Sequence, residues 1–448
     1  MSTERNLWGS RLGFVLAAAG SSVGLGAIWK FPYMAGANGG GAFLLVYLLA
    51  VVGIGISMML AELSIGRATH TDAVGAFGQL GGKKWRFFGY FSLLAAFIIL
   101  SFYCVVGGWT VGYLVKALTG SLLKPEHTEG FKEAFVRFIG DPVLSLVFFA
   151  IFMALTCSII LGGIKSGIER VSKILMPLLF LLIMAMIVRS VTLPNAIEGI
   201  RFFLIPDVSK ITAKTLIDAL GFACFSLSLG FGGMLTYGSY MQKQESMRKA
   251  AVWVVVLQTL CVLMAGFMVL PAVFAFGMTP TEGPTLTYIT LPAVFKAMPG
   301  GSIFAILFFA LLLIAALTSS VSIIEPLVTY LIDQFRWSRK KACAVVAITS
   351  FIAGIPASWS FGDSNLFTLF SKTAFDMMDY VTSNLMLPIN VLAACILMGW
   401  VVNKTFLYEL QQGETGKPKW ILLVNFCCKF IAPIVIVAIL LGSFFYRA

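Results

Sequence analysis

Eleven long apolar runs divide this chain of 448 residues, and they limit its fold more than any other feature. Most of them reach the roughly 20 residues that an α-helix needs to cross the hydrocarbon core of a bilayer. A composition of 59% hydrophobic and 12% charged residues is typical of polytopic membrane proteins. We therefore expect one all-α transmembrane domain over residues 1–448. Its expected spans are residues 12–35, 42–66, 88–118, 142–162, 168–190, 214–241, 250–277, 302–332, 341–356, 374–402 and 420–446.

The positive residues predict the orientation of these spans. A net charge of +12 would suit a nucleic-acid-binding protein, but the charges are distributed as membrane topology requires. Of the 32 Lys and Arg residues, 19 fall in loops on the side of the N-terminus and 11 on the opposite side. We therefore expect an integral membrane protein with a cytoplasmic N-terminus and, after eleven spans, an external C-terminus. The lipid membrane is an expected partner, and nucleic acid is not.

The first span contains a stretch that opposes continuous helix. Residues 20–26 read Gly-Ser-Ser-Val-Gly-Leu-Gly, and each glycine costs about 1 kcal/mol relative to alanine in a helix. Inside a bilayer, a helix break survives only where protein buries it or where it lines a cavity. The break therefore predicts a binding site made of free backbone groups. Close helix packing through Gly20 and Gly24 is the alternative interpretation.

The sixth span has a matching break in residues 225–233, Phe-Ser-Leu-Ser-Leu-Gly-Phe-Gly-Gly. Packing glycines in the first span alone do not explain this second break. Five spans separate the two, so residues 10–190 and 214–402 are expected to form inverted repeats, followed by an extra helix at 420–446. Paired interrupted spans of this kind indicate the binding site of a secondary transporter.

Several polar residues lie at membrane depth. Glu62 is an intramembrane acid, which either takes part in function or is a protonated side chain bonded to backbone carbonyls. Both interpretations hold if those carbonyls belong to the broken first span. Thr318-Ser319-Ser320 gives three adjacent hydroxyls in an apolar span. Beside carbonyls freed by a break, they would form an uncharged oxygen site suited to a hard cation such as Na⁺.

Catalytic motifs are not supported. Gly20-Ser21-Ser22-Val23-Gly24 fits the G-x-S-x-G nucleophile pattern, but that pattern needs a strand, a helix and a histidine base. The two histidines, His70 and His127, are expected in loops on opposite sides of the membrane. No nucleotide-binding or zinc-binding pattern is present, so we do not expect an enzyme.

At the level of whole motifs, the chain resembles the neurotransmitter:sodium symporter family, and in particular its LeuT-like bacterial amino acid transporters. This resemblance implies a LeuT-like fold: two inverted five-helix repeats with helices 1 and 6 unwound at mid-membrane, and one extra helix in place of the family's last two. It also implies a bacterial inner membrane. The matching residues are Trp8, Arg11-Leu12-Gly13, residues 20–26, Lys30-Phe31-Pro32, Asn38-Gly39-Gly40-Gly41-Ala42-Phe43, Glu62, Tyr103, residues 225–232, Thr318-Ser319-Ser320 and Asp379.

The resemblance implies two sodium sites. The second maps onto the carbonyls of Gly20, Val23 and Ala315 and the hydroxyls of Thr318 and Ser319, and it keeps the family's chemistry throughout. The first maps onto Ser22, Ala27, Ser226 and Gln258. There, Ala27 replaces an asparagine and Gln258 replaces an asparagine or aspartate. We therefore expect one bound Na⁺, coupling chiefly through the second site, with the first site degenerate.

The resemblance also implies a substrate pocket and two gates. Gly24 stands where amine transporters of the family have aspartate, which favours a substrate with its own carboxylate. The outer gate maps onto Lys30 and Asp379, and the inner gate onto Arg5 with Asp333, Trp8 and Tyr240. The implied pocket residues are Ser21, Ser22, Gly26, Ile99, Tyr103, Phe225, Ser226, Ser228, Phe231, Ser319 and Ile323.

The expected function is Na⁺-coupled symport of a neutral amino acid, hydrophobic or small, by alternating access. Two alternatives stay open from the sequence. One is a substrate sensor built on a transporter scaffold. The other is a Na⁺-independent or H⁺-coupled carrier for an amino acid or a related acid such as a sulfonate or betaine. A homodimer is a further expected assembly.

Overall fold

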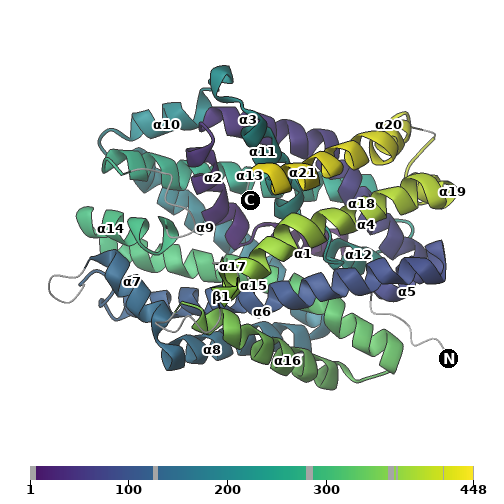
Figure 1. The fold of residues 1–448 in the computed structure, drawn as a ribbon, viewed down its shortest axis with the longest axis horizontal. Coiled ribbons are helices and arrows are strands. Elements are labelled where there is room, and N and C mark those ends of the chain that lie inside the picture. Colours follow the sequence, from purple (N-terminus) through teal and green to yellow (C-terminus); the bar gives the residue numbers. More distant parts are fainter. Residues whose placement is uncertain are drawn as a thin grey trace.

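A computed structural model describes residues 7–124, 130–278, 286–361, 368–369, 372–416 and 418–446. Nearly all of these residues are helical, and the long helices run side by side in one bundle (Figure 1). Short helices α7, α10 and α14 lie at one end of the bundle, and α5 and α19 lie at the other (Figure 1). The bounds of these five are Phe131–Gly140, Ala196–Leu204, Thr290–Ala297, Ala73–Gly81 and Asn403–Gln411.

Within the described residues, nine continuous segments are long and apolar enough to cross a membrane. They coincide with nine of the eleven expected spans. Four of these segments include π-helical turns. In three of them, a π-helical turn joins two α-helices: α3 to α4, α17 to α18, and α20 to α21. In the fourth, a π-helical turn precedes α9. The segments are Gly41–Thr69 (α3, α4), Lys83–Leu118 (α6), Pro142–Leu161 (α8), Ile164–Val191 (α9), Met247–Ala275 (α13), Gly301–Phe335 (α15), Arg339–Trp359 (α16), Ala374–Val401 (α17, α18) and Trp420–Gly442 (α20, α21).

Individual helix bounds within these segments follow the breaks in hydrogen-bond pattern. They are α3 Gly41–Ala50, α4 Ile56–Thr69, α6 Arg86–Leu118, α8 Pro142–Leu161, α9 Arg170–Val191, α13 Met247–Ala275, α15 Gly301–Phe335, α16 Arg339–Trp359, α17 Ala374–Tyr380, α18 Leu387–Ile396, α20 Trp420–Phe426 and α21 Ala432–Tyr446.

The two remaining spans are the broken ones. In the first, α1 (Arg11–Ser22) and the half-helix Gly26–Ala37, which contains α2 (Phe31–Ala37), meet at a bend of 50°. In the sixth, α11 (Ala213–Ser226) and α12 (Gly233–Ser239) flank six non-helical residues, 227–232. Both breaks expected from the sequence are therefore present.

One small departure from an all-helical fold precedes α17. The two-residue strands β1 (Thr368–Leu369) and β2 (Lys372–Thr373) pair antiparallel, with Thr368 opposite Thr373. The remaining short elements are single helical turns at Lys83–Trp85 and Val208–Lys210. None of these changes the bundle.

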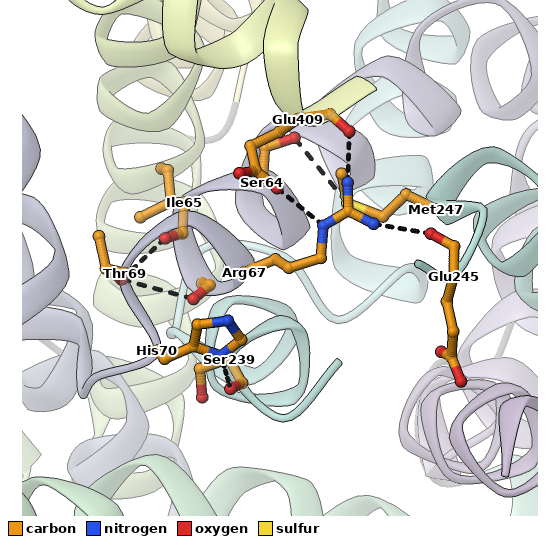
Figure 2. A network of polar contacts seen from close by, with 10 residues as sticks. Ser64, Ile65, Arg67, Thr69, His70, Ser239, Glu245, Met247 and Glu409 are labelled. Carbon is orange, nitrogen blue, oxygen red and sulfur yellow. Dashed lines mark hydrogen bonds and ion pairs between the residues drawn. The ribbon is translucent and has the colours of Figure 1, made fainter. Parts of the chain in front are cut away.

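A buried ion pair joins helices at the end of the bundle where α5 and α19 lie. The Arg67 side chain on α4 is fully buried, and its Nε is 2.8 Å from Glu409 Oε2 on α19. The guanidinium also donates to the Glu409 carbonyl and, over 2.8 Å, to the Glu245 carbonyl before α13 (Figure 2). Burial raises the pKa of the Glu245 carboxyl, against the opposing charges of Arg11 and Arg67. Arg67 thus holds three segments together.

Candidate functional site

The break in the first span exposes backbone carbonyls at the end of α1. The last amide to bond back into that helix is Val23 N–H, which donates to Ala19 O over 2.7 Å. The carbonyls of Gly20 and Ser21 accept bonds from side chains of other helices instead. Leu25 N–H, on the far side of the break, donates to the Tyr103 hydroxyl over 3.4 Å. Free helix-end carbonyls of this kind are natural ligands for cations.

The break in the sixth span depends on residues with positive φ. Ser228, Gly230 and Gly232 have φ values of 56°, 93° and 81°. A Cβ on Gly230 would lie 2.5 Å from the Leu387 carbonyl oxygen, so only glycine fits there. Gly230 N–H donates to Glu62 Oε1 over 2.7 Å. The partner of Glu62 is therefore an amide of the second break, whereas the sequence suggested carbonyls of the first.

Side-chain hydroxyls join the two breaks. Ser228 Oγ in the second break donates to Ser21 O in the first over 2.9 Å. Ser319 Oγ on α15 donates to Ser21 O over 2.9 Å and to Gly20 O over 3.3 Å. Ser21 Oγ donates in turn to Ser322 Oγ over 2.6 Å. The three elements thus meet through short neutral hydrogen bonds.

One cavity lies where these elements meet. All eleven residues that the resemblance implied for the pocket line it, together with Gly24, which the resemblance also singled out, and with Phe102, Ser322 and Leu387, which it did not suggest. None of the described residues that line it is charged. The lining residues are Ser21, Ser22, Gly24, Gly26, Ile99, Phe102, Tyr103, Phe225, Ser226, Ser228, Phe231, Ser319, Ser322, Ile323 and Leu387.

Oxygen atoms gather beside this cavity at the expected second sodium site. A Cβ on Gly20 would lie 3.2 Å from Thr318 Cβ, so α1 and α15 are in close contact there. Thr318 Oγ1 donates to Ala315 O over 3.1 Å, and Ser319 Oγ donates to Gly20 O. Each hydroxyl donates its hydrogen bond to a carbonyl oxygen, so the lone pairs of the hydroxyl oxygen can coordinate another ligand. The residues present therefore fit an alkali cation. Val23, whose carbonyl is also an expected ligand, directly follows α1.

The expected first sodium site has a different character. Ser22 and Ser226 line the cavity, and their hydroxyls donate to carbonyls of their own helices, Ala18 O and Ala223 O, as the Thr318 hydroxyl does, so the difference lies in the other two residues. Ala27 is fully buried and has no side-chain oxygen. Gln258, also fully buried, accepts a bond from the Tyr47 hydroxyl over 3.0 Å. These residues bring fewer free oxygen ligands together than the second site does.

The expected outer gate is not an ion pair in this structure. Lys30 Nζ lies 4.5 Å from the centre of the Phe225 ring, and Asp379 accepts a bond from Ser383 Oγ over 2.7 Å. No salt bridge joins Lys30 to Asp379 within the described residues. Lysine is a flexible point charge without arginine's planar fork, so an aromatic face competes well for it. The Phe225 ring lies close both to the Lys30 ammonium and to Gly26, where an added Cβ would be 2.5 Å from Phe225 Cε1.

The expected inner gate is only partly described. Arg5 lies outside the described residues, and Asp333 lies near the end of α15. Trp8 N–H donates to Tyr240 O over 3.1 Å, and its ring nitrogen donates to Tyr237 O over 3.0 Å. Trp8 is almost fully buried, so the segment before α1 is held against α12.

A family model described as the Sodium:neurotransmitter symporter family matches residues 5–134 and 134–447. The chain belongs to this family.

Similar proteins agree with this membership. A sodium-dependent transporter of Haemophilus influenzae is 40% identical over 456 residues, covering 99% of each chain. A sodium-dependent transporter of Bacillus subtilis is 38% identical over 437 residues, covering 97% of each. The crystal structure of MhsT in complex with L-phenylalanine has a TM-score of 0.90 and 42% identity, covering 98% of this chain and 100% of that one.

Three statements follow for this symporter. It is a sodium-dependent transporter rather than an enzyme, it is an integral membrane protein, and its fold is LeuT-like. All three agree with what the sequence led us to expect. The roles of individual residues in binding stay predictions.

Sequence reasoning missed one buried charge cluster in this symporter. Glu325 on α15 is fully buried and accepts two bonds of 2.8 Å from Arg339 on α16. The Tyr240 hydroxyl donates to the same carboxylate over 2.9 Å. A glutamate within an apolar run is a visible signal, but its partner lies on the next span, and sequence spacing does not reveal such a pair.

Proposed function

We propose that this symporter takes up a neutral, hydrophobic amino acid by alternating access, driven by Na⁺ held chiefly at the second site. The ligands of that ion would be the Gly20, Val23 and Ala315 carbonyls and the Thr318 and Ser319 hydroxyls. The cavity between the two breaks supports this proposal most strongly, because it adjoins the site where α1 meets α15.

The lining of the cavity supports the class of substrate. Its walls combine aromatic and aliphatic side chains with serine hydroxyls and helix-end backbone groups. Such a lining suits a zwitterion, whose carboxylate and ammonium meet opposite helix ends while its side chain meets apolar walls. Gly24 brings no fixed anion for an isolated amine. MhsT, with L-phenylalanine bound, provides a related example.

Alternating access would use the gates at the two ends of the broken helices. Lys30, with Asp379 on α17, would close the outer side above Phe225. Trp8 and Tyr240, with Arg5 and Asp333, would close the inner side. The two inverted repeats, residues 10–190 and 214–402, would move against each other around the ion and substrate, with the extra helix at 420–446 outside them.

Uptake into proteoliposomes tests this function. We expect inward Na⁺ to drive accumulation of radiolabelled L-phenylalanine or another apolar amino acid from a panel, and choline to abolish it. Thr318→Ala removes a proposed ligand and should lower the apparent Na⁺ affinity roughly 10-fold or more.

Ser320→Ala is the matched control, because Ser320 Oγ faces Thr156 Oγ1 at 2.8 Å, away from the proposed site. This variant should transport like the wild type. Uptake that persists in choline and in Thr318→Ala would favour a Na⁺-independent or H⁺-coupled carrier. Binding without counterflow would favour a sensor.

A further inference from the structure

The Gln258 side chain carries a buried donor whose partner is missing. Gln258 lies on α13 and is fully buried. Its Oε1 accepts the Tyr47 hydroxyl bond, while its Nε2 has no hydrogen-bond partner among the described residues. A buried amide N–H without an acceptor is costly, and native proteins rarely retain one without a reason.

Two contacts connect this amide with the substrate cavity. The Tyr47 hydroxyl, which fixes Oε1, is 3.5 Å from Ser226 Oγ, and Ser226 lines the cavity. The two ends of one amide are bonded to the same carbon, so Nε2 lies in the same buried corner. Helix α13 also packs against α1 and against Gly26–Lys30, the two sides of the first break.

The chemistry of this corner is opposite to that of a cation site. The Gln258 oxygen uses one of its two lone pairs to accept the Tyr47 hydroxyl bond, and the other end of the amide is a donor, which repels a cation and attracts a negative oxygen. Ala27 supplies no side-chain oxygen. Besides Gln258 Oε1, the side-chain oxygens of the four positions are the Ser22 and Ser226 hydroxyls, which donate to the Ala18 and Ala223 carbonyls.

We propose that the Gln258 amide replaces a bound ion at this position and holds the substrate carboxylate toward the Ser226 side of the cavity. Gln258 is a positioning residue in this proposal, because Tyr47 and then Ser226 connect it with the cavity. The proposal rests on the proposed function, since it assumes a substrate with a carboxylate. It assigns one Na⁺ to the wild-type protein, at the second site.

Counting bound ions tests the proposal without needing a substrate. Purified wild-type protein in detergent should bind one radioactive Na⁺ per chain at saturation. The double variant A27N/Q258D restores two oxygen ligands and removes the donor, so it should bind two. Ala27→Asn alone is the matched control and should still bind one, because the Gln258 donor remains. Two ions on the wild type, or no gain in the double variant, would overturn the proposal.

A second readout addresses the carboxylate directly. Gln258→Leu keeps a similar shape and removes the amide dipole that favours a carboxylate on the Ser226 side, and it should weaken L-phenylalanine binding roughly 10-fold. Binding of L-phenylalaninamide, which lacks the carboxylate, should change less than threefold. Equal loss for both ligands, or for neither, contradicts the proposal. If the wild type shows no Na⁺-dependent uptake, the proposed function fails, while the ion count still decides the role of Gln258.

Discussion

Gly24 shows at the residue scale how tightly the site is built. A Cβ at this position would lie 2.3 Å from Ser319 Oγ and 3.2 Å from the Tyr103 hydroxyl. We therefore expect Gly24→Ala to push Ser319 away from the α1 carbonyls and to lower uptake at least about 10-fold through a loss of both substrate and Na⁺ affinity.

Gly53→Ala is the control for this prediction, because Gly53 lies in a span with open space where a Cβ would be. Uptake by both variants at equal expression decides the matter. Wild-type activity in Gly24→Ala would show that the cavity beside Ser319 is not the transport site.

Glu62 carries a second prediction at this scale. Its Oε1 accepts the Gly230 amide bond, and glutamine keeps an oxygen acceptor at that position while leucine does not. Glu62→Leu should cost about 1–3 kcal/mol of stability, the cost of a buried amide left without an acceptor. Glu62→Gln should retain most stability and uptake. Thermal unfolding and uptake of both variants check this, and inactivity of a stably folded Glu62→Gln would instead indicate a proton-carrying role.

Individual residues also show which features of the site the sequence can predict and which it cannot. The motifs at 20–26 and 225–233 are distinctive, and the structure places residues of both around one cavity, while their part in substrate binding stays a prediction. Lys30 and Asp379 were expected to pair, but the lysine reaches Phe225 instead. A choice between two partners for one lysine depends on three-dimensional geometry, which a motif does not contain.

At the element scale, the buried Arg67–Glu409 pair ties α4 to α19 and to the segment before α13 (Figure 2). Removing one partner leaves the other charge buried and uncompensated. Arg67→Met should therefore lower the free energy of unfolding by about 3–5 kcal/mol, and the double variant R67M/E409M should recover a large part of it.

Arg248 gives the comparison, since its pair with Glu414 has the arginine 40% exposed. Arg248→Met should cost about 1 kcal/mol or less. Thermal unfolding in detergent measures all three variants. Equal losses for Arg67→Met and Arg248→Met would mean that the buried pair has no special structural role.

The elements themselves were predictable to different degrees. Long apolar spans follow from composition alone, and both breaks follow from clustered glycines and serines. Short helices such as α7, α10 and α14 lie in loops whose mixed composition has no membrane constraint. Their positions depend on packing against the ends of the bundle, which has no simple sequence signal.

At the scale of the whole molecule, the LeuT-like fold could be anticipated from the resemblance of several motifs, and two matching breaks five spans apart predict inverted repeats. The energetic consequence is also simple. A membrane potential of about 100 mV contributes ~2.3 kcal/mol per charge, and a tenfold Na⁺ gradient contributes ~1.4 kcal/mol. One coupled ion thus supports an accumulation on the order of several hundredfold, and two ions would square that limit.

The accumulation ratio at steady state, measured in proteoliposomes under that gradient and potential, tests the central claim most directly. The proposed function predicts that a neutral amino acid such as L-phenylalanine is concentrated several hundredfold with Na⁺, and that uptake rises with Na⁺ with a Hill coefficient near one. Equal concentrations inside and outside, unchanged when choline replaces Na⁺, would contradict coupling at the two broken helices.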